Sequence, residues 1–240
     1  MKLAVAVVAV LSIGLGLYSY FRPSGPTVDS TADALLSWNQ QLKSVADGQS
    51  TQIVLPDLRI PSRCLADLRP FVERITELNL AGDALATQIE TIAACRHLKI
   101  LHLRTELGDH EVSRLAELRE LEVLDLPLAL QVTDSGLKSL ELHPRLKLLR
   151  LRAPRVTNEG LRSFSQLPEL RWLHLMEVPL TDAGLEIFRA MTKLESLYLD
   201  GDQATDEGLS NLVSARPDLH FHRDQIHLSS DPRQRDGHLD

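Results

Sequence analysis

Aromatic residues are scarce in this 240-residue chain: Phe, Trp and Tyr together supply 4% of it, whereas hydrophobic residues as a whole supply 43%. The hydrophobic fraction is that of a globular protein, so its core must be built from aliphatic side chains. Cysteine is scarce too. Cys64 and Cys95 are too few for a disulfide framework and form no CxxC metal motif. We expect both to be small buried apolar residues.

A basic excess is missing as well. The chain has 26 Lys and Arg against 33 Asp and Glu, a formal net charge of -7. Nucleic-acid binders usually carry a basic stripe, so we expect no nucleic-acid partner. The sequence also contains no P-loop, no GxGxxG loop after a strand and no GxSxG elbow. We therefore expect no cofactor and no enzymatic activity.

Charge is absent from Leu3 to Tyr20, 18 positions flanked by Lys2 and Arg22. As a helix this run would be roughly 27 Å long, enough to cross the hydrocarbon core of a bilayer. We interpret residues 1–21 as a signal anchor, with a cleaved signal peptide as the alternative. The positive N-terminus favours the cytoplasmic side. This predicts a single-pass membrane protein with its globular part on the exported side, or a secreted protein if the segment is cleaved.

Two short segments separate this run from the main globular region. Residues 22–30 are rich in Pro, Gly and Ser and are interpreted as a linker. Residues 31–50 place apolar side chains at helical spacing among polar ones, which predicts a helix that caps the N-terminal end of the globular region. Those side chains are Leu35, Leu36, Trp38, Leu42 and Val45.

A leucine pattern, LxxLxL with occasional Ile, recurs seven times in residues 51–223. The starts of successive copies are 20, 23, 23, 25, 24 and 24 residues apart. The last two apolar positions of each copy alternate with polar ones, which predicts a short strand with those two side chains turned inward. The copies are Leu55-Leu58-Ile60, Ile75-Leu78-Leu80, Leu98-Leu101-Leu103, Leu121-Leu124-Leu126, Leu146-Leu149-Leu151, Leu170-Leu173-Leu175 and Leu194-Leu197-Leu199.

A second motif, T-[DN]-x-G-L, comes after the later strands. It begins at Thr133, Thr157, Thr181 and Thr205, each 24 residues after the last. Thr followed by Asp or Asn predicts the N-terminal cap of a helix. Each unit is then a strand and a helix that share one apolar seam, and such units bury the seam only by stacking.

These motifs resemble the leucine-rich-repeat superfamily, in particular its ribonuclease-inhibitor-like and cysteine-containing branch. The resemblance implies an α/β solenoid, a horseshoe with a parallel concave sheet and outer helices, here preceded by one N-terminal hydrophobic helix. It also implies a noncatalytic protein-binding role. The first three repeats lack the T-[DN]-x-G-L motif, so their helices are expected to be shorter or differently capped. Residues 224–240 are predicted to be a polar tail.

The strand positions between the inward leucines are expected to line the concave face. Apolar residues with Trp, Tyr and Arg beside them are typical of an interaction hot spot, although ordinary variation on an exposed sheet would also produce them. The alternatives to protein binding are a structural role in an envelope assembly and, more remotely, an enzyme that uses the concave histidines. The candidate partner-binding residues are Trp172, Arg150, Leu148, His174, Tyr198, Arg152, Asp125, Val123 and His102.

Histidine is comparatively frequent, with nine copies. His220 and His222 are two residues apart on an expected strand, so they would share one face, and His227 comes five residues later. We interpret this segment as a polar strand that ends the solenoid rather than as a metal site. His102 and His174 are expected to be roughly 14 Å apart, too far to share an ion.

Overall fold

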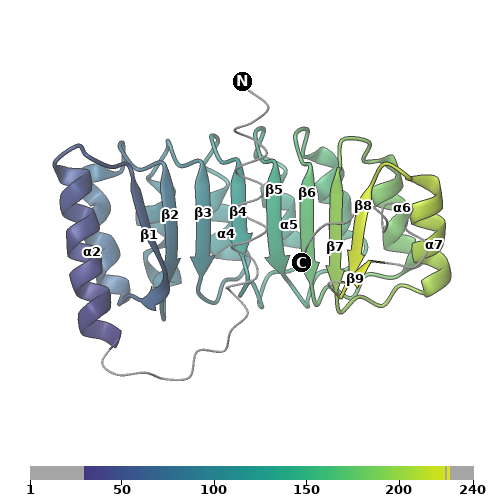
Figure 1. Cartoon of the computed structure of the whole chain (residues 1–240), viewed down its shortest axis with the longest axis horizontal. Helices are drawn as coiled ribbons and strands as arrows, with labels where there is room; N and C mark the ends of the chain where they lie inside the picture. The colour runs from purple at the N-terminus through teal and green to yellow at the C-terminus, as the bar shows by residue number, and fades with distance from the viewer. Residues whose placement is uncertain (1–29, 225, 228–240) are drawn as a thin grey trace. The chain divides into compact units, whose positions relative to one another are not determined.

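The computed structural model describes residues 30–224 and 226–227. Its centre is one nine-stranded sheet in which the strands succeed one another in chain order (Figure 1). Strands β1 to β8 are parallel, and β9 is antiparallel to β8. The strands are β1 (Gln52–Arg59), β2 (Glu77–Ala81), β3 (Ile100–Arg104), β4 (Val123–Leu126), β5 (Leu148–Arg152), β6 (Trp172–Met176), β7 (Ser196–Asp200), β8 (His220–Arg223) and β9 (Ile226–His227).

A helical segment returns the chain from the end of each repeat's strand to the start of the next. These segments lie on one side of the sheet, and α2 covers its first edge (Figure 1). Several are 3-10 helices, labelled η, where the repeat pattern predicts α-helix. The segments are α2 (Ser30–Ala46), η1 (Ser62–Phe71), η2 (Leu85–Gln88), α3 (Ile89–Ala93), α4 (Asp109–Leu115), α5 (Asp134–Leu140), η3 (Gly160–Gln166), α6 (Asp182–Ala190) and α7 (Asp206–Ala215).

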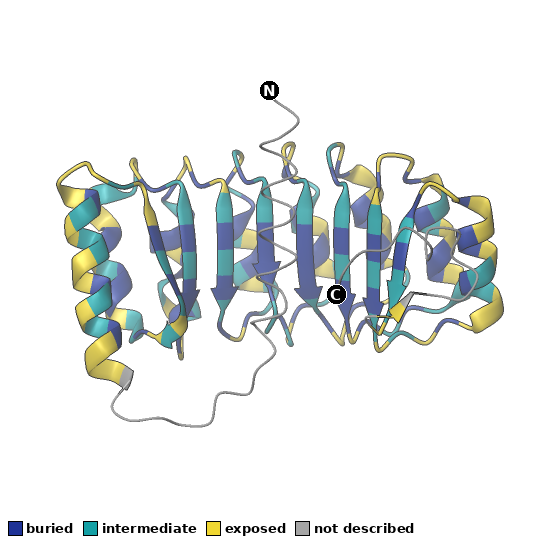
Figure 2. Cartoon of the chain, in the orientation of Figure 1, coloured by how far each residue is buried: buried dark blue, intermediate teal, exposed yellow. Residues whose placement is uncertain are grey.

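The leucine pattern builds the core between the sheet and these helices. From β2 to β7, inward leucines of one strand pair in register with those of the next strand, as Leu149 does with Leu173. All the inward leucines of these strands are at most 1% exposed, and they form the dark bands across the strands in Figure 2. One continuous aliphatic core therefore runs through all the repeats. This arrangement of parallel strands and helical returns matches a leucine-rich-repeat solenoid.

The first repeat has a different register from the one that the sequence predicts. Ile53 and Leu55 pair with Leu78 and Leu80, and a bulge lies between Leu55 and Arg59. Leu58, expected to point inward, is only half-buried. The LxxLxL match that begins at Leu55 is therefore wrong, because Ile53 and Leu55 hold the two inward positions of this strand. Its spacing of 20 residues, shorter than all the others, reflects this difference.

Helix α2 closes the first edge of the sheet. The Gln41 side chain accepts a hydrogen bond from the backbone N–H of Val54 (2.7 Å) and donates one to its carbonyl (2.9 Å). These bonds satisfy backbone groups that an edge strand would otherwise expose to other chains. Trp38, from the same helix, is fully buried against the first repeat and donates to Asp67. Helix α2 therefore covers the edge strand β1 and packs against the first repeat.

The T-[DN]-x-G-L motif works between repeats as well as within them. Oxygens of the Asp134 carboxylate accept from the Thr157 backbone N–H (2.8 Å) and hydroxyl (2.6 Å) of the next repeat. Asp182 holds Thr205 in the same way. The Asp therefore also binds the next repeat, in addition to its predicted place in the first turn of a helix. The motif's glycine lies close to the same carboxylate of the preceding repeat. At Gly160, for example, a Cβ would collide with the Asp134 carboxylate.

This ladder of hydrogen bonds has a defined start and end. It begins at Asp109, in a repeat without the motif, which accepts from Thr133 and from the Gly136 N–H. Beyond the last motif, the sequence has no further threonine for Asp206 to hold. Its carboxylate instead accepts from the Arg223 guanidinium at 2.8 Å. Arg223 thus closes the ladder at the far end of the sheet.

No helix among residues 30–224 and 226–227 is long and apolar enough to cross a membrane. The predicted hydrophobic helix, Leu3 to Tyr20, lies outside the described residues, as do residues 22–29 of the predicted linker and most of the tail, whereas Ser30 begins α2. The tail region contributes one unexpected element, since β9 pairs with β8.

Candidate functional site

The face of the sheet opposite the helices, which we call the open face, presents the residues that alternate with the buried leucines. The strand register arranges them in columns that run across the sheet. One column contains Glu77, Ile100, Val123, Leu148, Trp172, Ser196 and His220, and the next contains Asn79, His102, Asp125, Arg150, His174, Tyr198 and His222. With Arg152 beside Met176 in a third column, all nine candidate residues lie on this face.

A polar chain crosses the middle of the open face. His102 Nδ1 is 3.2 Å from Asp125 Oδ2, and Asp125 Oδ1 is 3.5 Å from Arg150 Nη1. Arg150 Nη2 also donates to the Met176 sulfur at 3.5 Å. The charge of Arg150 is therefore balanced by the chain's own carboxylate. Arg152 is similarly paired with Glu177, so these two arginines are held in place by their neighbours.

A cluster of rings occupies the part of the open face formed by β6, β7 and β8. Tyr198 stacks on His222, with centroids 4.5 Å apart and planes 15° apart, and lies 5.6 Å from the His174 ring. His174 Nε2 is in turn 2.8 Å from Asp200 Oδ2. His220 lies against His222 at 4.7 Å. The column positions predicted that these residues are neighbours, but the stacking could not be read from the sequence.

An apolar row lies beside this cluster. Ile100, Val123, Leu148 and Trp172 are successive members of one column and all are half-buried. A solvated strand face would normally place polar residues at such positions. The row ends at Trp172, one strand before Tyr198, so the aromatic side chains of the open face are gathered at one end of it.

Burial shapes the ionisation of two open-face residues. Burial raises the pKa of Tyr198, so its phenol stays protonated and can donate a hydrogen bond at neutral pH. Burial also raises the pKa of the Glu77 carboxyl, while the nearby His102 opposes this shift. Both shifts disfavour the negatively charged form of these two side chains.

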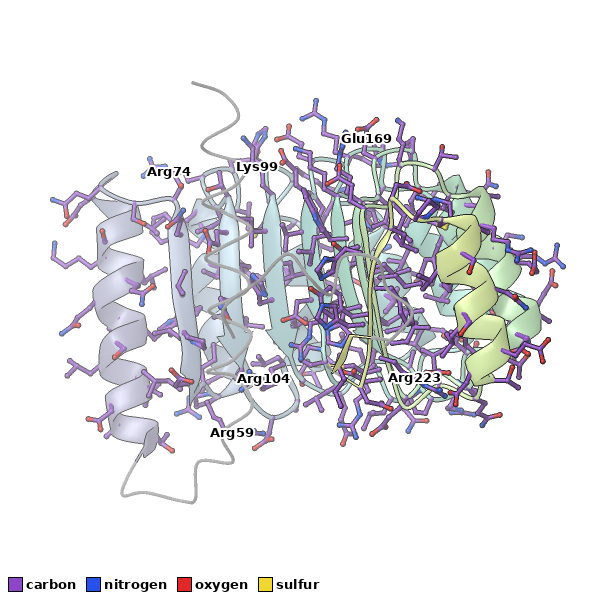
Figure 3. The ribbon with its side chains drawn as sticks, turned by 45° about the vertical axis from the view of Figure 1, so that its right-hand side comes forward. Arg59, Arg74, Lys99, Arg104, Glu169 and Arg223 are labelled. Atoms are coloured by element: carbon purple, nitrogen blue, oxygen red, sulfur yellow. The ribbon has the colours of Figure 1, made fainter. Side chains whose placement is uncertain are left out.

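The two long edges of the sheet are rimmed with charge. Figure 3 shows Arg74, Lys99 and Glu169 along the edge where strands begin, and Arg59, Arg104 and Arg223 along the edge where they end. Ion pairs along the edge where the strands begin join neighbouring repeats, as Lys147 with Glu122 (2.6 Å) and Lys193 with Glu169 (2.9 Å) do. Exposed pairs of this kind contribute about 1 kcal/mol or less each. These ion pairs therefore border the open face and contribute little to stability.

The two cysteines are buried free thiols, as predicted. Burial raises the pKa of Cys95 to about 12 and raises that of Cys64 as well, so neither forms a reactive thiolate at neutral pH. Within the described part of the chain, no group of three or more His, Cys, Asp or Glu side chains is arranged to hold a metal ion. The order of the strands also keeps His102 and His174 three strands apart.

No protein-family profile matches this sequence, and no curated protein matches it either. Among solved structures, the chain is similar to an internalin from Listeria monocytogenes, with a TM-score of 0.48 and 17% sequence identity. That similarity covers 80% of this chain and 68% of the internalin chain.

Proposed function

We propose that this chain is a noncatalytic protein-binding module whose partner docks on the open face, with Trp172 as the central anchor. The observation that supports it is the distribution of aromatic side chains. Among the described residues, Trp38, Phe164, Phe188 and Phe221 are in the core and Phe71 packs against it. Of the described aromatic residues, Trp172 and Tyr198 alone serve no such packing role, and they lie on adjacent strands of the same face.

The surroundings of Trp172 fit the composition of a binding hot spot. Such sites combine buried aromatic anchors with a ring of near-neutral contacts that exclude water. Leu148 and Val123 extend the apolar surface on one side of Trp172, and the Tyr198 phenol supplies a hydrogen-bond donor on the other. Arg150, already paired with Asp125, would fix the shape of this surface more than supply a free charge.

Affinity capture with wild-type protein and two single variants tests this proposal. Trp172→Ala should lose the specific partner, whereas Arg162→Ala should retain it, because Arg162 is an exposed residue of η3 on the helix side. A partner that survives Trp172→Ala but is lost with Arg162→Ala would move the binding surface to the helices.

We further propose that residues 1–21 tether the module to a membrane with the repeats on the exported side. The uncharged run from Leu3 to Tyr20 supports this proposal. Full-length protein should remain with membranes through high salt and an alkaline wash, because a spanning helix is held by hydrocarbon burial rather than by charge. A chain that starts at Pro23 should be released. Mature protein whose first residue lies beyond residue 16 would show a cleaved signal peptide instead.

A further inference from the structure

The strand that ends the parallel sheet brings two imidazoles into direct contact. His220 and His222 alternate with Phe221 on β8, and Phe221 is fully buried toward the core. Both histidines therefore project from the open face. Their Nε2 atoms face each other at 2.6 Å. At this distance two neutral imidazoles must share one proton, since one ring nitrogen has to donate and the other to accept.

We propose that His220 and His222 form a chelating site for a divalent transition-metal ion of the zinc or copper type. A neutral imidazole nitrogen is a preferred ligand of these ions. Two nitrogens bound to one ion at about 2.0–2.1 Å lie about 3.0–3.4 Å from each other, and the observed pair would have to open by less than about 1 Å to reach that separation. Small side-chain rotations supply such a movement. The ring that donates the shared proton carries its N–H on Nδ1 when the ion is bound, so that both Nε2 atoms present a lone pair to the ion, and water completes the coordination.

The neighbours of the pair hold it in place. Tyr198 of β7 stacks flat on the His222 ring and also lies 6.0 Å from the His220 ring. A ligand that is already oriented loses less conformational entropy when it binds. On the other side, the strand register sets His227 of β9 opposite His222.

The local charges also permit a bound cation. Arg223 is the cation nearest to the pair along β8, but its position alternates with those of the two histidines, as that of Phe221 does. Its guanidinium donates to Asp202 (3.1 Å), to Asp206 (2.8 Å) and to the Ala204 carbonyl (2.9 Å). These two carboxylates offset its charge at the lower edge of the sheet, where Figure 3 labels it. Asp200, on the neighbouring strand, adds a negative charge beside His174.

Titration of the full-length chain with Zn²⁺, followed by calorimetry, tests the site. We expect one Zn²⁺ per wild-type chain, removed by EDTA, and at least a tenfold loss of affinity in His220→Gln and in His222→Gln. His102→Gln is the matched control, because it removes another open-face imidazole and should bind Zn²⁺ as the wild type does. Cu²⁺ bound to the wild type should show nitrogen hyperfine structure in its electron paramagnetic resonance spectrum.

Thermal unfolding of the wild type guards against a folding defect in the variants. Because an ion that binds only the folded state raises its stability, Zn²⁺ should raise the Tm of the wild type and EDTA should reverse the rise. Zn²⁺ binding of unchanged affinity in the double variant His220→Gln/His222→Gln would overturn the proposal. So would a wild-type chain that takes up no Zn²⁺.

Discussion

Leu149 and Arg150 are neighbours on β5, yet their side chains lie on opposite faces of the sheet, and the two faces obey different rules. On the helix side, the same residue type returns at the same place in strand after strand, as Leu101, Leu124, Leu149, Leu173 and Leu197 do. On the open face, no two adjacent strands from β2 to β8 carry the same residue at the central position.

The difference shows that stacking of the repeats constrains the residues of the two faces to different degrees. The helix side must match from repeat to repeat, because every unit buries its apolar seam against the next. The open face makes no such demand, so the residues there are set by something other than stacking. Substitutions on the two faces should therefore separate stability from binding.

The largest effect is expected on the helix side. Leu149→Ala and Leu173→Ala each remove a fully buried side chain and should each lower the free energy of unfolding by about 2–5 kcal/mol. Glu195→Ala is the control, because Glu195 is exposed at the sheet edge, and should change it by less than about 0.5 kcal/mol. Chemical denaturation measures both. Equal losses at both kinds of position would show that Leu149 and Leu173 do not belong to the core that stabilises the stack.

The helix side also contains one buried histidine, and its protonation in acid should lower the stability of the fold. Burial lowers the pKa of His143 to about 4, opposed by its hydrogen bond to the Leu118 carbonyl. The folded chain thus binds this proton less readily than the unfolded chain, whose histidine pKa is about 6.5. The contribution of this group to stability is therefore complete above pH 6.5 and declines as the pH falls toward 4, by about 3 kcal/mol in all.

Denaturation curves between pH 7.5 and 4 test this dependence. His143→Gln should flatten the decline in stability over this range, whatever its effect at neutral pH. His110→Gln, at an exposed position of α4, is the control and should leave the slope unchanged. A wild-type chain whose stability does not change between pH 6.5 and 4 would show that His143 is not held neutral.

A smaller effect is expected at the ladder that links the repeats along their helical sides. Asp134→Ala removes the acceptor of two hydrogen bonds and should cost about 1–2 kcal/mol, because the Thr157 N–H and hydroxyl both lose their partner. Asp134→Asn should cost less, since Asn158 accepts from the Thr181 N–H at the equivalent position of the next repeat. Glu159→Ala, an exposed neighbour, is the control. Equal stability in all three variants would mean that the ladder does not stabilise the stack.

The repeat spacing predicted most of the fold, because burying leucines about every 24 residues leaves few other architectures. It predicted the strands from β2 to β7, their order and the residues that share the open face. It predicted the first strand wrongly, since α2 and the bulge after Leu55 impose a local register that no other repeat has. It also could not separate 3-10 from α-helical returns, because both bury the same residues, as Leu161 and Phe164 do in η3.

The candidate site could be predicted in its membership but not in its contacts. Period-two alternation placed Trp172, His174 and Tyr198 on one face. Whether Tyr198 stacks on His174 or on His222 depends on side-chain torsions, which a repeat pattern does not determine. The role of Asp134 was hidden for a similar reason. A capping residue and a residue that binds the next repeat have the same sequence signature, and only the three-dimensional stack distinguishes them.

Binding on the open face is tested most sharply by comparing affinity and stability in Trp172→Ala. The side chain is half-buried on the open face, so its loss should change the free energy of unfolding by no more than about 1 kcal/mol. The same change should weaken partner binding by at least about 2 kcal/mol, or roughly thirtyfold in Kd. A small loss of stability together with a large loss of affinity is the predicted result. Unchanged affinity for a partner that binds the wild-type repeats would contradict a binding role for this face.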